Sequence, residues 1–281
     1  MKTIVIVLGA LVILYVGLRG AGWYRQRAGV RTALDQLRAE APGAHANVSH
    51  AAIDAAQLPP IVRTYLKRAL PDGAPIPRFA TLQQRGGFRL KAGAPFMDMQ
   101  AEQLFSVQAP GLVWQASMKM VQGLPILVRD TLVDGHGEFG GRLLGLVTVA
   151  AGSGPETDAA TLVRYLSEAI WFPYALLPSD HLRWEAIDDS SGRAFLSDRG
   201  RTATGIYTFD GSGRPITFDA DRPRDVEGKP VRTPWHVTLD KHTRMAGVEI
   251  PAKGSVTWRL PEGPLEYGRF EIVSLDFEPV L

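Results

Sequence analysis

Residues 164–173 read Arg-Tyr-Leu-Ser-Glu-Ala-Ile-Trp-Phe-Pro and lie between two long blocks of strand-like sequence. Pro155 and Glu156 provide a first turn that favours a helix upstream of this stretch. Apolar residues then recur at helical spacing, and Pro173 ends the regular helix. A single helix among strands must bury its apolar stripe against a sheet. We therefore expect a helix near residues 155–177 that covers one.

The blocks on either side of this helix alternate apolar and polar residues with a period of two. Met97, Met99, Ala101, Phe105 and Val107 mark one such strand, and the alternation resumes after the helix and continues to residue 277. Glycine-containing turn sequences separate the strands, as antiparallel hairpins require. The pattern predicts a mainly β (α+β) fold, with a large curved antiparallel sheet or open barrel covered by the helix.

An apolar run occupies residues 3–18, with Thr3 its one polar member. At roughly 16 residues it is slightly shorter than a bilayer span, which residues 20–24 would complete. Trp23 and Tyr24 are typical of an interfacial anchor. The alternative is a cleaved signal peptide, although Arg19 just before the small residues argues against cleavage. We expect a single-pass helix in the cell (inner) membrane.

The charges that flank the run bear on orientation. Positive side chains are more numerous after it than before it, which favours a cytoplasmic C-terminal domain. The sequence divides into a transmembrane anchor (1–27), a helical juxtamembrane segment with a linker (28–56) and a single antiparallel β domain (57–281). The membrane is thus one expected partner of the chain.

Composition excludes several classes of function. The chain has Cys 0, so disulfides, thiolate catalysis and cysteine-ligated metals are excluded. A net charge of +2 does not suggest a nucleic-acid partner. The histidines show no metal-ligand spacing, and a Gly-x-Ser-x-Gly elbow is absent. We expect no metal and no cofactor, and the sequence inclines away from catalysis without excluding it.

Three motifs carry a resemblance. They are Leu-Pro-Pro-Ile-Val-Arg-Thr-Tyr-Leu at 58–66, the stretch at 164–173, and Thr-Pro-Trp at 233–235. Together with the N-terminal apolar segment, they resemble an uncharacterised bacterial family of unknown function, a likeness that implies no activity. More loosely, the strand-rich pattern with a covering helix is similar to the open barrel of the LolA and LolB lipoprotein carriers. That similarity concerns fold class alone.

The candidate ligand-binding residues are large aromatic and flexible side chains of the strands, together with residues of the central motif. They are Trp114, Met118, Met120, Arg164, Tyr165, Glu168, Trp171, Trp235 and Trp258. A curved sheet lined in this way can enclose a lipid or another apolar ligand. The alternative is that the tryptophans fill an ordinary core.

Arg164 and Glu168 are one helical turn apart, so they are expected to form an ion pair. If buried, they would instead orient a polar head group or a reacting carbonyl. From these residues we expect an anchored domain that binds an apolar or amphipathic ligand, such as envelope lipid, without catalysis. Two alternatives stay open: an enzyme that uses Glu168 with Arg164 and His236, and a scaffold for protein interactions.

Overall fold

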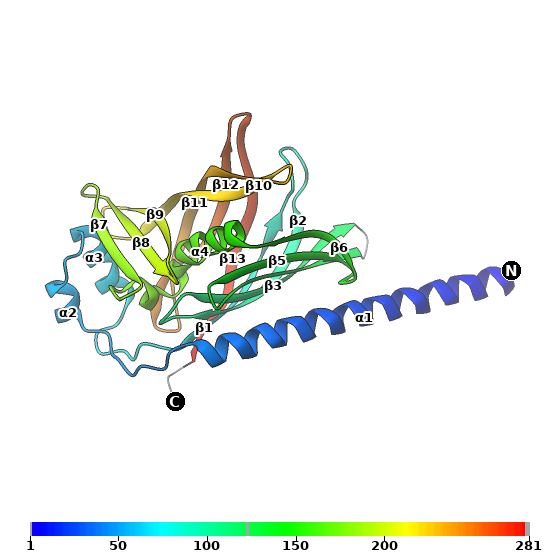
Figure 1. The fold of residues 1–281 in the computed structure, drawn as a ribbon, viewed down its shortest axis with the longest axis horizontal. Helices are drawn as coiled ribbons and strands as arrows, with labels where there is room; N and C mark the ends of the chain where they lie inside the picture. The colour runs from blue at the N-terminus through cyan, green and yellow to red at the C-terminus, as the bar shows by residue number, and fades with distance from the viewer. Residues whose placement is uncertain (1, 122–123, 279–281) are drawn as a thin grey trace.

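One antiparallel sheet dominates the computed structural model, which describes residues 2–121 and 124–278 (Figure 1). Its 13 strands follow the order β6-β5-β4-β3-β2-β1-β13-β12-β11-β10-β9-β8-β7. The first half comprises β1 (Phe79–Phe88), β2 (Met97–Ser106), β3 (Gly111–Val121), β4 (Leu124–Val133), β5 (His136–Leu143) and β6 (Val147–Ser153). The second half comprises β7 (Leu182–Ala186), β8 (Ser191–Asp198), β9 (Arg201–Phe209), β10 (Pro215–Val226), β11 (Lys229–Met245), β12 (Val248–Leu260) and β13 (Gly263–Glu278). The predicted open, strongly curved sheet is confirmed.

The covering helix joins the two edges of this sheet. After β6, the chain enters α4 (Pro155–Glu168), continues through two 3-10 turns, η1 (Ala169–Trp171) and η2 (Pro173–Leu176), and begins β7 at the opposite edge. In Figure 1, α4 lies across the concave side. The helix starts after Gly154, whose φ of 91° suits glycine, and buried Asp158 accepts a 2.7 Å hydrogen bond from the backbone of Gly137. The helix predicted near 155–177 is confirmed, with its last part as 3-10 turns.

Strand register orders the side chains on the concave face into transverse rows. Neighbouring strands pair Gln103 with Trp114, and Trp114 with Asp130. Two residues further along each strand, Ala101 pairs with Ala116, and the next such row joins Met99 with Met118. Since side chains alternate across a strand, these rows all face α4. The face therefore changes from polar to apolar toward the turn between β3 and β4.

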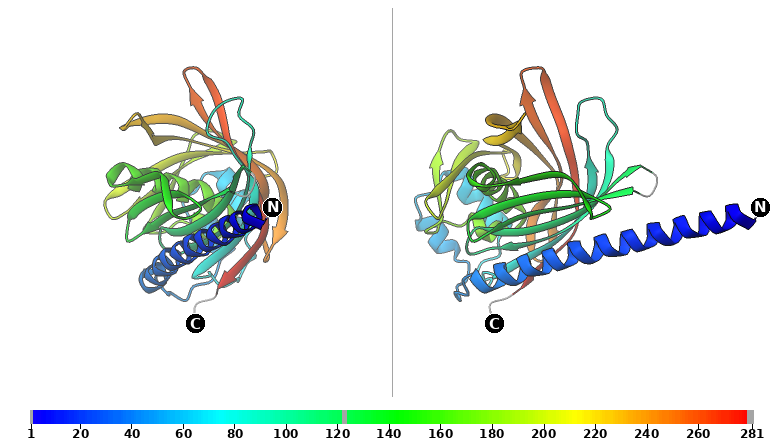
Figure 2. Two further views of the ribbon diagram at one scale, coloured as in Figure 1. Left: turned by 90° about the vertical axis from the view of Figure 1, so that its right-hand side faces the viewer. Right: turned by 45° about the vertical axis from the view of Figure 1, so that its right-hand side comes forward.

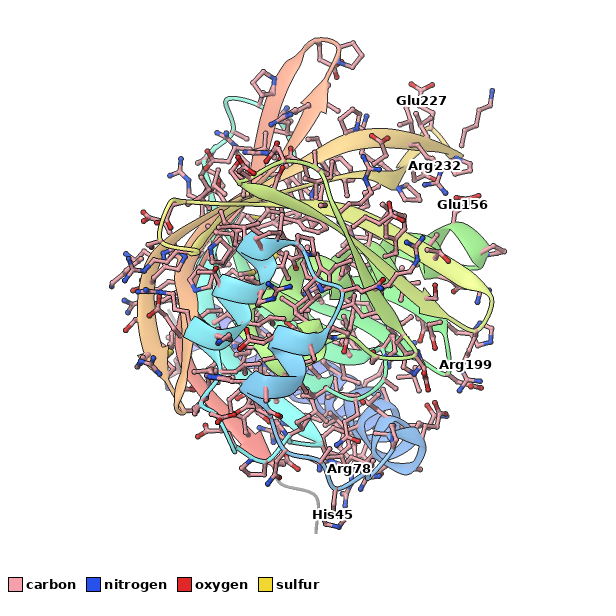
Figure 3. All side chains as sticks on the ribbon, turned by 90° about the vertical axis from the view of Figure 1, so that its left-hand side faces the viewer. His45, Arg78, Glu156, Arg199, Glu227 and Arg232 are labelled. Atoms are coloured by element: carbon pink, nitrogen blue, oxygen red, sulfur yellow. The ribbon has the colours of Figure 1, made fainter. Side chains whose placement is uncertain are left out.

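Two short helices cover the far end of the curved sheet. They are α2 (His50–Ala55) and α3 (Pro60–Ala69), which Figure 3 shows in front of the strands. Their contacts include a 2.8 Å ion pair between Arg68 and Glu249 of β12. The apolar face of α3, with Val62, Tyr65 and Leu66, is buried in the main core. This end of the sheet is consequently closed.

A single long helix, α1 (Lys2–Glu40), begins the described chain (Figure 2). Of the described residues, it is the one helix long and apolar enough to cross a membrane. Its C-terminal half packs on the outer face of the sheet, where Val30, Ala33 and Leu37 bury Leu104 and Val113. Arg38 adds an ion pair with Glu278, and Arg78, labelled in Figure 3, donates to the carbonyl of Arg38.

The packing of α1 bears on the boundary that was expected between the anchor and the juxtamembrane segment. The helix is continuous through the boundary expected between residues 27 and 28. Residues 30–40 form part of the domain's packed surface, because their apolar side chains cover strands β2 and β3. This contact could not be predicted from the sequence, since a short apolar stripe does not reveal what covers it.

Candidate functional site on the concave face

Arg164 of α4 is at the centre of a polar cluster under the helix. Its Nη1 lies 2.6 Å from Oδ2 of Asp130, and its Nε lies 2.9 Å from Oε1 of Glu168. The guanidinium also stands 4.7 Å from the ring centroid of Trp114. The side chains of Arg164, Asp130 and Glu168 are exposed by 12%, 8% and 14%. The expected ion pair is confirmed, and it is buried.

Two glutamine amides extend this cluster. Gln103 donates through Nε2 to Glu168 at 2.8 Å, and Gln84 accepts from Trp114 Nε1 at 3.1 Å. A carboxylate only accepts and an indole only donates, so these contacts fix the orientation of both amides. Among the described residues, Gln84 Nε2, Gln103 Oε1 and Asp130 Oδ1 are buried without a hydrogen-bond partner. The cluster therefore presents one unused donor and two unused acceptors.

The charges in the cluster stabilise one another. Burial alone would lower the pKa of Arg164, but Glu168 and Asp130 outweigh that effect and raise the pKa. With one guanidinium and two carboxylates, the formal charge of the three ionised groups is negative. A buried site of this sign favours neutral or cationic ligand groups over anionic ones.

A second group of aromatic side chains adjoins the cluster. Trp235 donates to the hydroxyl of Tyr267 at 2.9 Å, and Trp258 stacks on the Tyr267 ring with centroids 5.7 Å apart. Arg222 stands 4.9 Å from the Trp235 centroid. Burial raises the pKa of Tyr267, and the charges of Arg222 and Arg164 act against it. Tyr267 thus joins the tryptophans of β11 and β12, and it lies within electrostatic range of Arg164.

Methionine and small residues form the neighbouring part of the face. Met118 is buried, and it pairs across the sheet with Met99 on one side and Ile126 on the other. Ala101 and Ala116 separate this row from Trp114. We call Met99, Met118, Ile126, Ala101 and Ala116 the methionine face. The side chain of Met120, which was predicted to join it, lies outside the described residues.

Tyr165 and Trp171 lie apart from the cluster. The Tyr165 hydroxyl donates to the carbonyl of Ser106 at 2.7 Å, and its ring packs against Phe105. Trp171 donates to the carbonyl of Pro251 at 3.2 Å, and it meets Phe270 edge-on. Both therefore anchor the helix and its following turn to the sheet, and their role in ligand binding stays a prediction.

His236 was the third residue of the enzyme alternative. Its Nδ1 lies 2.8 Å from Asp219 Oδ1, and Arg259 contacts the same pair. Because Trp235 faces the interior, the adjacent His236 faces outward. The structure thus does not bring His236 to Glu168. Within residues 2–121 and 124–278, no group of three His, Asp or Glu side chains is placed to hold a metal ion.

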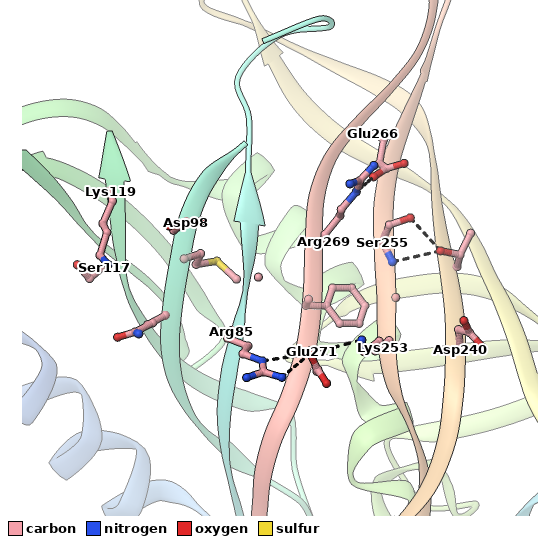
Figure 4. A pocket seen from close by; sticks show the side chains of 16 residues that line it. Arg85, Asp98, Ser117, Lys119, Asp240, Lys253, Ser255, Glu266, Arg269 and Glu271 are labelled. Atoms are coloured by element: carbon pink, nitrogen blue, oxygen red, sulfur yellow. Dashed lines mark hydrogen bonds and ion pairs between the residues drawn. The ribbon is translucent and has the colours of Figure 1, made fainter. Parts of the chain in front are cut away.

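The described residues also form grooves elsewhere, and two of them are large. One, of about 690 Å³, crosses the outer face of the sheet and is lined by charged side chains (Figure 4). These charges compensate one another; Arg85 and Lys253, for example, contact Glu271 at 2.9 and 3.6 Å. The other, of about 480 Å³, lies beside α1 and includes Arg129 and Glu138. Such balanced, exposed charges suit a hydrated surface better than an apolar ligand.

Sequence reasoning missed Gln84, Gln103, Asp130 and Tyr267. The first three could have been found from the sequence, because each is a polar residue at a strand position where the alternation predicts an apolar one. Gln103 falls between Ala101 and Phe105, where the alternation calls for an apolar side chain. A polar residue at a buried position is more informative than an exposed apolar one.

A comparison with protein families finds one match for the chain. Residues 48–270 match the model of DUF6544, a family of unknown function. No curated protein matches the sequence.

Several solved structures are remotely similar. A domain described as an outer membrane lipoprotein-sorting protein, from Vibrio parahaemolyticus, has 12% identity and a TM-score of 0.40, covering 72% of this chain and 86% of its own. A LolA superfamily protein from Nitrosomonas europaea has 12% identity and a TM-score of 0.35, covering 78% and 92%. A DUF1329 family protein from Desulfovibrio piger has 10% identity and a TM-score of 0.40, covering 83% and 94%. At these values the likeness carries no conclusion about a ligand.

Proposed function

We propose a binding function for this chain, which belongs to the DUF6544 family of unknown function. In this proposal it is a membrane-anchored domain that takes up an amphipathic molecule, such as an envelope lipid, without catalysis. One observation carries the proposal. On the concave face, a buried polar cluster with unpartnered atoms adjoins the methionine face.

The polar cluster suits the head of such a molecule. An unpartnered buried polar group costs about 1–3 kcal/mol, so Gln84 Nε2, Gln103 Oε1 and Asp130 Oδ1 are costly as they stand. A head group with hydroxyl groups supplies both donors and acceptors to them. The negative formal charge of the Arg164 cluster also favours such a head over a carboxylate.

The methionine face suits the apolar part. Methionine side chains are unbranched and adapt to ligands of different shape. Met99 and Met118 are buried in this structure, so an acyl chain would enter by moving them. From Trp114, the face extends along β3 and β4 toward the turn that joins these strands.

The geometry of Glu168 supports binding over catalysis. One carboxylate oxygen is held by Arg164 and the other by Gln103. A general acid or base must exchange a proton with a substrate within hydrogen-bond reach. Glu168 already has a fixed partner on each oxygen, so it is better suited to orienting neighbouring groups.

The N-terminal half of α1 supplies the proposed anchor. Its apolar side chains are exposed, among them Ile6 at 70% and Ile13 at 74%. A helix of this composition has no stable place in water. We place it across the cell membrane, and the cytoplasmic side for the domain stays a prediction from the flanking charges.

The proposal is tested by binding of a fluorescent monoacylglycerol to a chain that begins at residue 25. We expect saturable binding that quenches tryptophan fluorescence, and weaker binding after Trp114→Ala. Trp184→Ala is the matched control, because Trp184 is equally buried but packs against Tyr207 and donates to Leu176. Absence of saturable binding by the folded wild-type chain would contradict the proposal.

A further inference from the structure

The orientation of α1 relative to the sheet is fixed by close contacts. Gln26 donates to the carbonyl of Val128 at 3.0 Å. Leu37, nearer the C-terminal end of the helix, is buried against the sheet. At Gly22 the helix touches the turn between β5 and β6. A Cβ at this position would lie 1.7 Å from the carbonyl oxygen of Leu144, so only glycine fits. The N-terminal half of the helix leaves the domain at this contact.

The length of that half determines where the surface of a membrane would lie relative to the domain. At 1.5 Å per residue, the part of α1 before Gly22 extends roughly 30 Å, which equals the hydrocarbon thickness of a typical membrane. Figures 1 and 2 show it projecting beyond the ends of the nearby strands. If this half spans the membrane, the β5–β6 turn lies at the membrane surface.

Aromatic and basic side chains of α1 lie where this placement puts the membrane surface. Trp23 and Tyr24 follow Gly22 directly and are exposed by 40% and 79%. The guanidinium of Arg27 stands 5.1 Å from the Trp23 centroid. Tryptophan, tyrosine and arginine are typical of the headgroup region.

Strand ends at the level of this membrane surface carry exposed apolar side chains. On the β5–β6 hairpin, Val147 and Val149 are exposed by 62% and 53%. At the start of β4, Leu124 is exposed by 36%. The start of β4 and the β5–β6 turn are in contact, because the amide of Leu144 donates to the carbonyl of Pro125 at 2.8 Å. These side chains form one apolar edge, contiguous with the exposed helix.

We propose that this edge, consisting of Leu124, Val147 and Val149, inserts into the headgroup region of the bilayer that α1 spans. The inference rests on the proposed anchor and adds a second, peripheral contact to it. Burying apolar side chains in the interface is favourable because it removes their surface from water. The contact holds the strand ends against the membrane, so that the methionine face opens toward the lipid that it is proposed to take up.

The absence of cysteine from the sequence makes a direct test possible. The full chain carrying Val147→Cys, labelled with the environment-sensitive fluorophore NBD, is reconstituted into vesicles of phosphatidylethanolamine and phosphatidylglycerol. A fraction of the lipids carries a nitroxide quencher on the upper acyl chain. Val149→Cys is a second position on the edge. Ile187→Cys is the matched control, because Ile187 is 42% exposed and directly follows β7, a strand at the other end of the molecule in Figure 1.

We expect the label at position 147 or 149 to be quenched several-fold more strongly than the label at 187. Equal, weak quenching at all three positions, in protein that floats with the vesicles, would overturn the inference and leave the anchor intact. Protein that fails to float with the vesicles would overturn the anchor, and the inference with it.

Discussion

The guanidinium of Arg164 lies over the ring of Trp114, 4.7 Å from its centroid, while both of its neighbouring carboxylates stay within hydrogen-bond distance. The guanidinium of Arg164 thus joins α4 to the sheet through an ion pair with Asp130 and a cation–π contact with Trp114. These charged side chains are buried between the helix and the sheet, where a curved sheet usually holds only apolar side chains. In the proposed function, this arrangement recognises the head group of the ligand.

Removing one partner of this buried cluster is expected to destabilise the fold. Glu168→Gln leaves Arg164 with one carboxylate, and breaking a buried pair typically costs about 3–5 kcal/mol. Glu138→Gln is the control, because Glu138 pairs with Arg129 at 2.9 Å but is 57% exposed, where a loss of about 0–1 kcal/mol is usual. Urea unfolding measures both. Equal losses for the two variants would show that burial of the Arg164 cluster contributes nothing.

The sign of the cluster predicts a preference among ligands. Wild-type protein should bind a fluorescent monoacylglycerol more tightly than the corresponding fatty acid, because the head site already holds an excess of carboxylates. Asp130→Asn removes one negative charge and should narrow or reverse this preference. Titration with the two ligands, on variants shown to be folded, provides the comparison. An unchanged ratio in Asp130→Asn would place the head group elsewhere.

Packing of α1 on the outer face predicts where the stable domain begins. A chain starting at residue 25 should unfold at a higher urea concentration than one starting at residue 47, because the shorter chain exposes Leu104 and Val113. Leu37→Ala in the longer chain should cost about 2–5 kcal/mol for the same reason. Identical unfolding midpoints for the two chains would mean that the helix contributes no stability.

Acid should weaken the contact between α3 and β12 through Glu249. Burial alone would raise the pKa of Glu249, but Arg68 and Arg214 outweigh it and hold the pKa below its usual value of 4.5. A lowered folded-state pKa stabilises the protein above pH 4.5, and this contribution is lost as pH falls through the folded value.

Glu249→Gln should therefore lower the free energy of unfolding at pH 7, and the difference from wild type should shrink below pH 4.5. Exposed Glu262→Gln is the control and should change little at either pH. A difference that stays constant down to pH 3 would show that Glu249 does not titrate with folding.

The sequence predicted the class of fold because its signals are local. Period-two alternation identifies strands, and Pro155 with Pro173 delimits the helix. The joining of the two halves of the sheet is not local, since β1 pairs with β13 from the opposite end of the chain. Trp235 and Tyr267 lie on β11 and β13, the two strands that flank β12, and the curvature of the sheet brings Tyr267 within range of the charge on Arg164. The partners of Trp114, Arg164 and Glu168 were consequently harder to identify than these residues themselves.

The central claim is that the concave face holds an amphipathic molecule in the anchored protein. Native mass spectrometry of the full chain, released from detergent after purification from membranes, tests it most directly. We predict a stoichiometric lipid adduct on wild-type protein, with its occupancy reduced several-fold by Trp114→Ala and unchanged by Trp184→Ala. Wild-type protein that is folded and carries no lipid above the level of Trp114→Ala would contradict the account.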